Sequence, residues 1–354
     1  MNAYYYALGI MSGTSLDGVD LALCQFEYNR MQWRYKLLNS ATYAYPKEWK
    51  DKLSTAHKLD SHSFIKLHKE YGDYLGSLVN RFTKGMPIKI TLIASHGHTI
   101  FHDPKEKITF QLGDGNYIAA FTGITTISDF RTMDVALGGQ GAPLVPMGDE
   151  LLFHMYDYCL NLGGFANISF KKSEKRIAFD ICPVNIAINL MASEAGKEFD
   201  KDGYIAMKGK INTALLENLN DLEFYKLPSP KSLGREWFES IIVPLIVDSS
   251  IKLEDRIRTF YEHIAIQIAK IIINNKQQSV LITGGGALNQ YLIQILKEHS
   301  HHQFVLPGRE IIEFKEAIVF AFLGVLRFRG EINVLGSATG ARTNSVSGVI
   351  HKII

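Results

Sequence analysis

The chain has 354 residues, of which 46% are hydrophobic, and this length favours two domains with substantial cores. Its 38 lysines and arginines nearly balance its 36 aspartates and glutamates. This balance excludes a charge field that would by itself recruit nucleic acid or an anionic membrane, so a small-molecule partner is expected. The longest apolar run, 317–326, has about half of the roughly twenty residues that a membrane span needs.

The cysteines and the N-terminus point to an intracellular protein. Cys24, Cys159 and Cys182 are an odd number without C-x-x-C spacing, so we expect them to be reduced and buried. The first residues lack the basic stretch and the apolar core of a signal peptide. We therefore expect the protein to be soluble and cytoplasmic.

The hydrophobic pattern predicts two similar series of elements. The first series contains strands and helices at 4–10, 19–26, 33–45, 47–56, 61–82, 90–94, 116–121 and 125–128. A long glycine-rich stretch, 129–146, follows and is expected to hold the domain boundary. The second series contains elements at 158–170, 176–180, 185–195, 234–246, 255–275, 280–283, 288–299, 304–306 and 316–328. Because each series opens with a glycine-turned hairpin, the pattern indicates a duplicated α/β architecture.

The first hairpin carries the segment GIMSGTSLDGVD, residues 9–20. Its small residues let backbone amides approach an anion, and three side chains add hydroxyl donors: Ser12, Thr14 and Ser15. A carboxylate, Asp17 or Asp20, could hold the hydration shell of magnesium. No lysine follows and a strand lies on both sides, so the segment is not a P-loop. It predicts a phosphate-binding turn, with an ordinary Asp-Gly hairpin turn as the alternative.

Two further glycine elements lie in the second half. NLGGFANI, residues 161–168, offers Gly163 and Gly164 for close approach and Asn167 for an amide contact, although a simple strand turn explains it equally well. VLITGGGALN, residues 280–289, has three glycines between a strand and a helix start: Gly284, Gly285 and Gly286. It is not a dinucleotide-binding fingerprint, because Asn289 stands where the third glycine is needed. Glycine elements in both halves favour a nucleotide that both domains contact.

Several polar side chains are candidates for chemistry. Asp180, at the end of a strand in AFDICPVN, is either a general base at a cleft edge or the cap of the next helix. Arg131 is suited to an ion pair with a neighbouring aspartate or to an anionic substrate. Glu316 opens an apolar helix and is explained by the helix dipole. In KSLGREWF, residues 231–238, the pattern favours a plain helix start.

The segment SHGHTIFH brings three histidines close together: His96, His98 and His102. On a strand, His96 and His98 would share a face. No cysteine or carboxylate completes a zinc site nearby, so a hydrogen-bonding loop near a polar substrate is favoured over a metal site.

These motifs resemble those of the anhydro-N-acetylmuramic acid kinase family, in the actin, Hsp70 and sugar-kinase superfamily. The resemblance runs nearly from end to end, and the segments that carry it are GIMSGTSLDGVD, ASHGHT, FQLGDGNYIA, SDFRTMDVALGGQGAPLVP, NLGGFANI, AFDICPVN, KSLGREWF, GGGALN, EAIVFAFLG and TGA at 339–341. It implies two RNase H-like, actin-like ATPase domains that flank a deep cleft. We expect the first domain to comprise 1–128 plus 338–354 and the second to comprise 129–337.

The resemblance also implies a reaction. The family hydrolyses the 1,6-anhydro bridge of a recycled cell-wall sugar and phosphorylates the freed oxygen, giving N-acetylmuramic acid 6-phosphate and ADP. Asp180 would take the proton from the attacking water. Sugar contacts are expected from Asp20, Arg131 and Glu316. ATP and Mg²⁺ would be the cofactors, and a homodimer with no nucleic-acid or membrane partner is implied.

The expected nucleotide contacts are Ser12, Gly13, Thr14, Ser15, Leu16, Asp17, Gly18, Val19, Gly163, Gly164, Asn167, Gly284, Gly285 and Gly286. Asp17 is also expected to hold magnesium, directly or through water.

The chain departs from the family pattern at two places. It has FDICPVN where FDTGPGN is usual, and SHGHT where SHGQT is usual. Losing two glycines removes backbone freedom beside Asp180. Two alternatives therefore stay open: an ordinary sugar kinase that acts on a free hydroxyl, and a catalytically inactive nucleotide-binding sensor.

Overall fold

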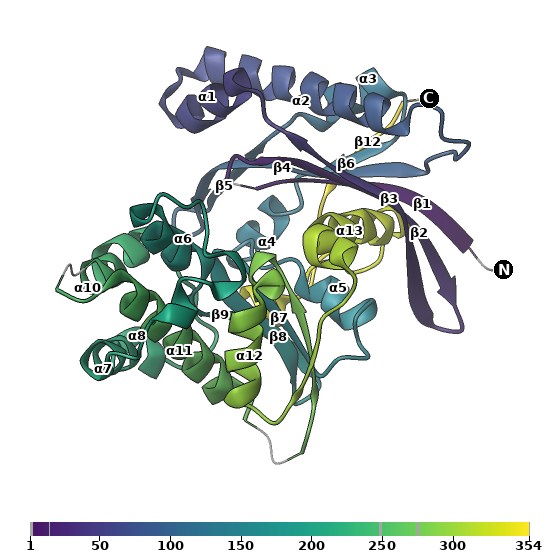
Figure 1. Cartoon of the computed structure of the whole chain (residues 1–354). Helices are drawn as coiled ribbons and strands as arrows, with labels where there is room; N and C mark the ends of the chain where they lie inside the picture. The colour runs from purple at the N-terminus through teal and green to yellow at the C-terminus, as the bar shows by residue number, and fades with distance from the viewer. Residues whose placement is uncertain (1–2, 14, 248–249, 274–275, 354) are drawn as a thin grey trace. The chain divides into compact units, whose positions relative to one another are not determined.

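The computed structural model describes residues 3–13, 15–247, 250–273 and 276–353 (Figure 1). The chain forms two compact units. Unit 1 comprises Met1–His154 and Phe314–Ile354, and unit 2 comprises Met155–Glu313. Both units are mixed α/β, as the sequence predicts. The expected boundaries at 128/129 and 337/338 are wrong, because residues 129–154 and 314–337 belong to unit 1.

Contacts inside unit 1 explain this difference. The Ser347 hydroxyl donates to the Phe130 carbonyl at 2.8 Å, and the Thr339 hydroxyl donates to the Asp134 carboxylate at 2.6 Å. The glycine-rich stretch after residue 128 is therefore held by the C-terminal part of the chain. A stretch that looks like a linker by composition is in fact packed structure.

Unit 1 is built on a seven-stranded sheet with the order β12-β6-β4-β1-β2-β3, in which β5 pairs with β4. Its described strands are β1 (Ala3–Ser12), β2 (Gly18–Asn29), β3 (Gln32–Ala44), β4 (Leu92–Asp103), β5 (Ile108–Leu112), β6 (Thr126–Ser128) and β12 (Val349–His351). Strand β1 pairs antiparallel with β2 and parallel with β4. The strand β5 was not predicted.

Helices cover both faces of this sheet (Figure 1). The unit contains α1 (Lys47–Thr55), η1 (Ala56–Lys58), α2 (Ser61–Thr83), α3 (Gly115–Thr122), α4 (Thr132–Ala136), α5 (Pro146–Leu151), most of α13 (Arg309–Arg329) and α14 (Gly336–Thr339). Leu8 and Ile10 of β1 join the apolar core formed with α1, α2 and α3. On the opposite face α13 approaches so closely that a Cβ on Gly9 would lie 1.9 Å from the Ala317 carbonyl oxygen. Gly9 therefore permits this close packing of helix on strand.

Unit 2 repeats the strand order of unit 1. Its described strands are β7 (Tyr158–Leu162), β8 (Phe165–Lys172), β9 (Lys175–Pro183), β10 (Ser279–Thr283) and β11 (Gln303–Val305), in the order β11-β10-β7-β8-β9. Reversed, this order matches β3-β2-β1-β4-β6, with antiparallel pairs in the meander and parallel pairs beyond it. The predicted duplicated architecture is confirmed.

The helical elements of unit 2 are α6 (Asn185–Glu194), η2 (Lys201–Gly203), η3 (Ala206–Lys208), α7 (Thr213–Asn220), α8 (Glu223–Lys226), α9 (Arg235–Trp237), η4 (Phe238–Ile242), α10 (Val243–Ile246), α11 (Leu253–Ile271), η5 (Gly285–Leu288) and α12 (Gln290–Glu298). One apolar core joins side chains of α6, α11 and α12 to the sheet, including Ile168 and Ile181. This core holds the sheet in place near the ends of β7, β9 and β10.

The predictions for the cysteines are confirmed, whereas those for the histidine segment and for Glu316 are wrong. The three cysteines are free and buried, as expected. Within the described part of the chain, no helix is long and apolar enough to cross a membrane. Strand β4 extends to Asp103, so the histidine segment is a strand where we expected a loop. Helix α13 begins at Arg309, so Glu316 lies inside this helix and does not open it.

Candidate functional site

The turn between β1 and β2 presents polar groups to solvent. Ser15 and Asp17 are exposed, and Leu16 has a positive φ of 59°. The Tyr45 amide donates to the Asp17 carbonyl at 3.2 Å, which ties this end of the turn to the residue after β3. Thr14, also an expected nucleotide contact, lies outside the described residues. The turn therefore offers a hydroxyl and a carboxylate at its surface.

Two expected nucleotide contacts in this segment are buried instead. Val19 is fully buried in the apolar core, so only its backbone can take part in binding. Ser12 is also fully buried, and its hydroxyl lies 2.6 Å from the Tyr45 hydroxyl and 2.8 Å from the Tyr71 hydroxyl. The Ser12 hydroxyl, which was expected to donate to an anion, is enclosed by these tyrosines.

The two glycines of this turn have different surroundings. A Cβ on Gly18 would lie 2.4 Å from the Tyr43 carbonyl oxygen, so packing against β3 explains this glycine. A Cβ on Gly13 would meet only the Ser15 hydroxyl, at 3.5 Å. The fold does not require a glycine at position 13, and an outside group can approach the backbone there.

In unit 2 the turn between β7 and β8 is held by backbone hydrogen bonds. The Val184 amide donates to the Gly164 carbonyl at 2.8 Å, and the Asn185 amide donates to the Gly163 carbonyl at 3.2 Å. Gly164 is exposed, and a Cβ there would have only one neighbour within 4 Å, the Ile186 Cβ at 3.9 Å. The turn is thus fixed against the start of α6 while its outer surface stays open.

The three glycines after β10 also differ in how much space surrounds them. Gly284 has φ of 80°, and its Cβ would lie 2.5 Å from the Asn161 side-chain oxygen. A Cβ on Gly286 would lie 2.7 Å from the Leu162 Cβ. A Cβ on Gly285, which is exposed, would approach nothing closer than the Asn185 side-chain nitrogen at 3.5 Å. The fold requires the outer two glycines and leaves the middle one open.

Asn185 connects the two glycine elements of unit 2, although its local sequence does not mark it as a site residue. Its backbone amide binds Gly163, and its side chain donates to the Leu162 carbonyl at 3.0 Å and lies beside Gly285. Asn167, by contrast, is paired across the sheet with Asn161 on one side and Asp180 on the other. The structure therefore brings the predicted phosphate-contacting segments of unit 2 to one edge, next to the strand that carries Asp180.

Asp180 is a partly buried carboxylate near the end of β9. Its amide donates to the Lys231 carbonyl at 2.9 Å, and its Oδ2 accepts from the Leu233 amide at 2.8 Å. Burial raises the pKa of Asp180 to about 6, and the hydrogen bond from Leu233 opposes this shift. The helix-cap alternative is wrong, because the N-cap of α6 is Val184 and no side chain caps it. The segment 231–238 therefore orients Asp180, a role that its helix-like pattern does not reveal.

The departures from the family pattern beside Asp180 face the core. Ile181, Cys182 and Val184 are at most 2% exposed. None of the four residues 181–184 has a positive φ. None of them therefore adopts the left-handed conformation that favours glycine.

In unit 1, Arg131 is bound to other protein groups through its whole guanidinium. Its Nε and Nη2 donate to His96 Nε2 at 3.0 and 2.7 Å, and its Nη1 donates to the Gly141 carbonyl at 2.6 Å. His96 Nδ1 lies 2.8 Å from the Gly97 carbonyl and so carries the ring proton. Burial and the adjacent Arg131 hold the pKa of His96 well below its usual value, so this histidine is neutral. Burial also lowers the pKa of Arg131 to about 10.

Asp20 and Glu316 lie near this arginine. Both Arg131 and Asp20 act electrostatically on Glu316, whose pKa is raised mainly by desolvation, with Asp20 adding to the shift and Arg131 opposing it. The Glu316 side chain is nevertheless exposed, so solvent limits the size of this shift. Asp20 accepts from the Thr42 hydroxyl at 2.6 Å. The structure thus brings together the three residues expected to contact the sugar.

Asp134 supports Arg131 and was considered only as an ion-pair partner in the sequence. It is fully buried and accepts from the Thr339 hydroxyl and, at 2.8 Å, from the Gly141 amide. Because Gly141 also accepts from Arg131, Asp134 fixes the loop that holds the guanidinium. The segments SDFRTMD and TGA both carry the family resemblance, but only the fold shows that they meet.

The histidines do not form a metal site. Gly97 adds one residue to β4 between the positions paired with Ile10 and Ser12, and its φ is 73°. This bulge separates the two neighbours, so His96 contacts Arg131 while His98 contacts Ser12. The described residues contain no group of three or more histidines, cysteines or carboxylates that could hold a metal.

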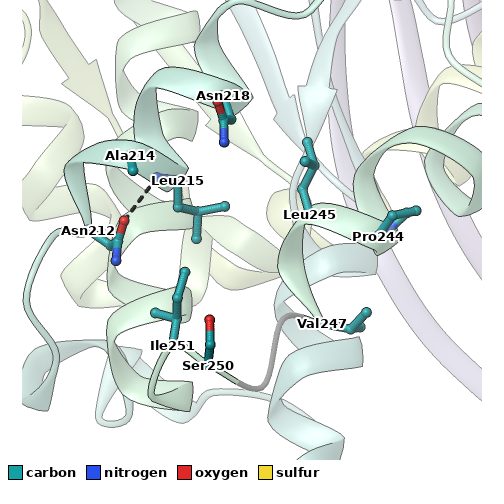
Figure 2. A pocket seen from close by; sticks show the side chains of 9 residues that line it. All are labelled: Asn212, Ala214, Leu215, Asn218, Pro244, Leu245, Val247, Ser250 and Ile251. Carbon is teal, nitrogen blue, oxygen red and sulfur yellow. Dashed lines mark hydrogen bonds between the residues drawn. The ribbon is translucent and has the colours of Figure 1, made fainter.

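A cavity of about 570 Å³ lies elsewhere in unit 2 (Figure 2). It is lined by Asn212, Ala214, Leu215, Asn218, Pro244, Leu245, Val247, Ser250 and Ile251. None of the predicted site residues lines it. A smaller cavity of about 280 Å³ in unit 1 is lined by polar side chains that include His96 and Asp129.

A family model and related sequences agree on one family. The model of the family "Anhydro-N-acetylmuramic acid kinase" matches residues 5–353. An anhydro-N-acetylmuramic acid kinase of Vibrio cholerae is 34% identical over 97% of this chain and 97% of its own length. A second, of Francisella tularensis subsp. novicida, is 36% identical over 99% of this chain and 100% of its own length. A solved xylulose kinase from Lactobacillus acidophilus is 11% identical, with a TM-score of 0.45 over 91% of this chain and 89% of its own.

Proposed function

The chain belongs to the anhydro-N-acetylmuramic acid kinase family, and on that premise we propose how its residues carry out the reaction. It is a phosphotransferase with an alcohol group as acceptor, and it acts on 1,6-anhydro-N-acetylmuramic acid in peptidoglycan recycling. In the proposed reaction water adds to the anomeric carbon, the bond from that carbon to the bridging oxygen breaks, and this oxygen takes the γ-phosphoryl group of ATP. The products are N-acetylmuramic acid 6-phosphate and ADP.

The single observation that carries the mechanism is the environment of Asp180. A general base works best when its pKa lies near the working pH. Burial raises the pKa of Asp180 to about 6, so the carboxylate is ionised at neutral pH and still basic enough to take a proton from water. The Leu233 amide holds Oδ2, which leaves Oδ1 as the oxygen that accepts this proton.

ATP is the proposed phosphoryl donor, and its phosphates are proposed to lie against Gly13, Gly164 and Gly285. These are glycines that neither packing nor backbone conformation explains, as expected where a ligand approaches bare backbone. Asp17, exposed on its turn, would hold magnesium together with water and phosphate oxygens. Magnesium, when bound, neutralises charge on the transferred phosphoryl group.

Asp20, Arg131 and Glu316 are proposed to contact the sugar. His96 and Gly141 fix the Arg131 side chain. It is therefore already in place to present a positive charge or a hydrogen bond to the sugar. The exposed carboxylate of Glu316, with its raised pKa, is suited to accept a hydrogen bond from a sugar hydroxyl.

The products formed in oxygen-18 water test this proposal. Purified protein with MgATP and 1,6-anhydro-N-acetylmuramic acid should yield a sugar phosphate that carries the heavy oxygen at the anomeric position. A control with N-acetylmuramic acid 6-phosphate alone measures anomeric exchange with solvent. Phosphorylation of N-acetylmuramic acid at a free hydroxyl, without use of the anhydro sugar, would instead indicate an ordinary sugar kinase. ATP binding without any sugar phosphate would indicate an inactive sensor.

The family resemblance also carries a proposed homodimer and a cytoplasmic location. Light scattering during size-exclusion chromatography tests the first, and cell fractionation tests the second.

A further inference from the structure

Ser12, Tyr45, Tyr71 and His98 form a hydrogen-bonded cluster in unit 1, which we term the hydroxyl–histidine cluster. Ser12 Oγ lies 2.6 Å from Tyr45 Oη, 2.8 Å from Tyr71 Oη and 3.1 Å from His98 Nδ1, and the two tyrosine hydroxyls also bond to each other. Ser12 and Tyr71 are fully buried, and the other two are at most 4% exposed. These hydrogen bonds form out of water, where an unmade bond is costly.

A count of protons assigns the role of His98. The cluster contains four hydrogen bonds, but its three hydroxyls can donate only one each. Burial lowers the pKa of His98 to about 4, so the ring carries a single proton at neutral pH. All four bonds form only if that proton is on Nδ1, and we assign this tautomer. The hydroxyls then donate around a ring, while Ser12 also accepts from His98.

Residues of the cluster adjoin both ends of the candidate phosphate-binding turn. Ser12 is the last residue of β1, and Gly13 follows it. At the other end of the turn, the amide of Tyr45 donates to the Asp17 carbonyl. Tyr45 thus holds one end of the turn by its backbone and the other by its side chain.

The bulge in β4 is what brings His98 to this place. Ile10 pairs with Ser95, but Ser12 pairs with His98, because β4 has one residue more than β1 between these pairs. A Cβ on Gly97 would lie 2.4 Å from the Leu112 carbonyl oxygen, so the bulge also depends on glycine. Without the extra residue, His98 would not lie opposite Ser12.

We propose that the hydroxyl–histidine cluster positions the Gly13–Asp17 turn for the phosphates of ATP, with His98 supplying the proton that completes the cluster. The inference rests on the proposed function, in which this turn binds ATP. None of the four side chains is proposed to touch the nucleotide; they are positioning residues that act through the backbone of the turn. Removing the polar group of one of these side chains should therefore weaken ATP binding without changing the contacts to the sugar.

The first test compares two tyrosine-to-phenylalanine variants. Tyr71→Phe removes one hydroxyl of the cluster, whereas Tyr74→Phe removes a hydroxyl outside it, from a ring 6.0 Å from that of Tyr71. By isothermal titration with MgATP, Tyr71→Phe should bind about tenfold more weakly than wild type, and Tyr74→Phe should stay within about twofold. The KM for 1,6-anhydro-N-acetylmuramic acid should change less than about twofold in both variants, since the cluster acts on the turn alone.

The second test uses His98, and it remains informative if Tyr71→Phe does not fold. His98→Leu removes the donor, while His98→Asn places an amide N–H near the position of Nδ1. Leucine should weaken ATP binding about as much as Tyr71→Phe, and asparagine should restore most of it. Melting temperatures separate this from a merely structural role, which would lower stability but leave the ATP affinity of the folded protein unchanged.

Equal ATP affinity in Tyr71→Phe and Tyr74→Phe, or no advantage of asparagine over leucine, would overturn the inference alone. Failure of the wild-type protein to bind MgATP in the same titration would instead overturn the proposed function and this inference with it.

Discussion

The two units share one strand order but support their glycine turns by different means. In unit 1 the turn after β1 is held by buried side chains that hydrogen-bond to Ser12. In unit 2 the turn after β7 is held by backbone amides at the start of α6, at Val184 and Asn185. A duplicated topology therefore does not imply a duplicated site.

The difference follows from the lengths of the turns. Five residues lie between β1 and β2, but only Gly163 and Gly164 lie between β7 and β8. A two-residue turn is fixed by its backbone geometry, whereas a longer turn needs additional contacts to adopt one conformation. The catalytic candidate, Asp180, follows the unit 2 pattern, because its contacts to residues 231–233 are with backbone groups.

The largest expected effect concerns Asp180. Asp180→Asn keeps the shape of the side chain but removes the base, so turnover should fall about a hundredfold or more. MgATP affinity should change little, because the glycines of both turns are untouched. Coupled detection of ADP release measures turnover, and isothermal titration measures binding. Asp221→Asn, the same change at an exposed carboxylate of unit 2, is the control. Near-normal turnover in Asp180→Asn would exclude this residue as the base.

The next prediction distinguishes glycines at which a Cβ would clash with neighbouring atoms from glycines at which it would find free space. Gly18→Ala in unit 1 and Gly286→Ala in unit 2 would press a methyl group into neighbouring atoms and should each cost about 1–3 kcal/mol of unfolding free energy. Gly13→Ala and Gly164→Ala should keep wild-type stability, yet weaken MgATP binding about fivefold or more if ATP lies against them. Urea denaturation and titration with MgATP measure the two effects. If all four variants lose stability alike, the distinction between open and required glycines is wrong.

The last expected effect is a gain in stability that depends on pH. The pKa of Asp180 is raised from 3.8 when unfolded to about 6 when folded, so the ionised carboxylate destabilises the fold above pH 6, and this penalty disappears below about pH 4. Asp180→Asn removes the penalty and should stabilise the protein by about 1–3 kcal/mol at pH 8, with little change at pH 4. Denaturation at both pH values measures this. A variant that is less stable than wild type at pH 8 would contradict the buried-carboxylate explanation.

The repeated strand order could be predicted because the hydrophobic pattern and the glycine turns recur in both halves. The site was predicted only in part. Asp180 and the open glycines lie in short segments whose chemistry is local. Asn185, Leu233 and Asp134 act through contacts with residues distant in sequence, and no local pattern marks them.

The errors have physical causes as well. Ser12 was expected to donate to an anion because hydroxyls in glycine-rich turns commonly do so, but its hydroxyl is enclosed by two tyrosines from distant parts of unit 1. The domain boundary was misplaced because residues 129–146 have the composition of a loop. Their packing depends on residues about two hundred positions later, such as Thr339 and Ser347.

The division of the chain between the units has a consequence for synthesis on the ribosome. Unit 2 is one uninterrupted stretch, whereas unit 1 needs α13 and also β12, which pairs with β6. Domains generally fold as units during translation. Unit 2 is synthesised after the first part of unit 1 but can therefore complete its fold first. Unit 1 cannot complete its sheet until β12 has left the ribosome. The N-terminal sheet, in which β12 pairs with β6, keeps this strand edge open until β12 is made, and an open edge favours aggregation.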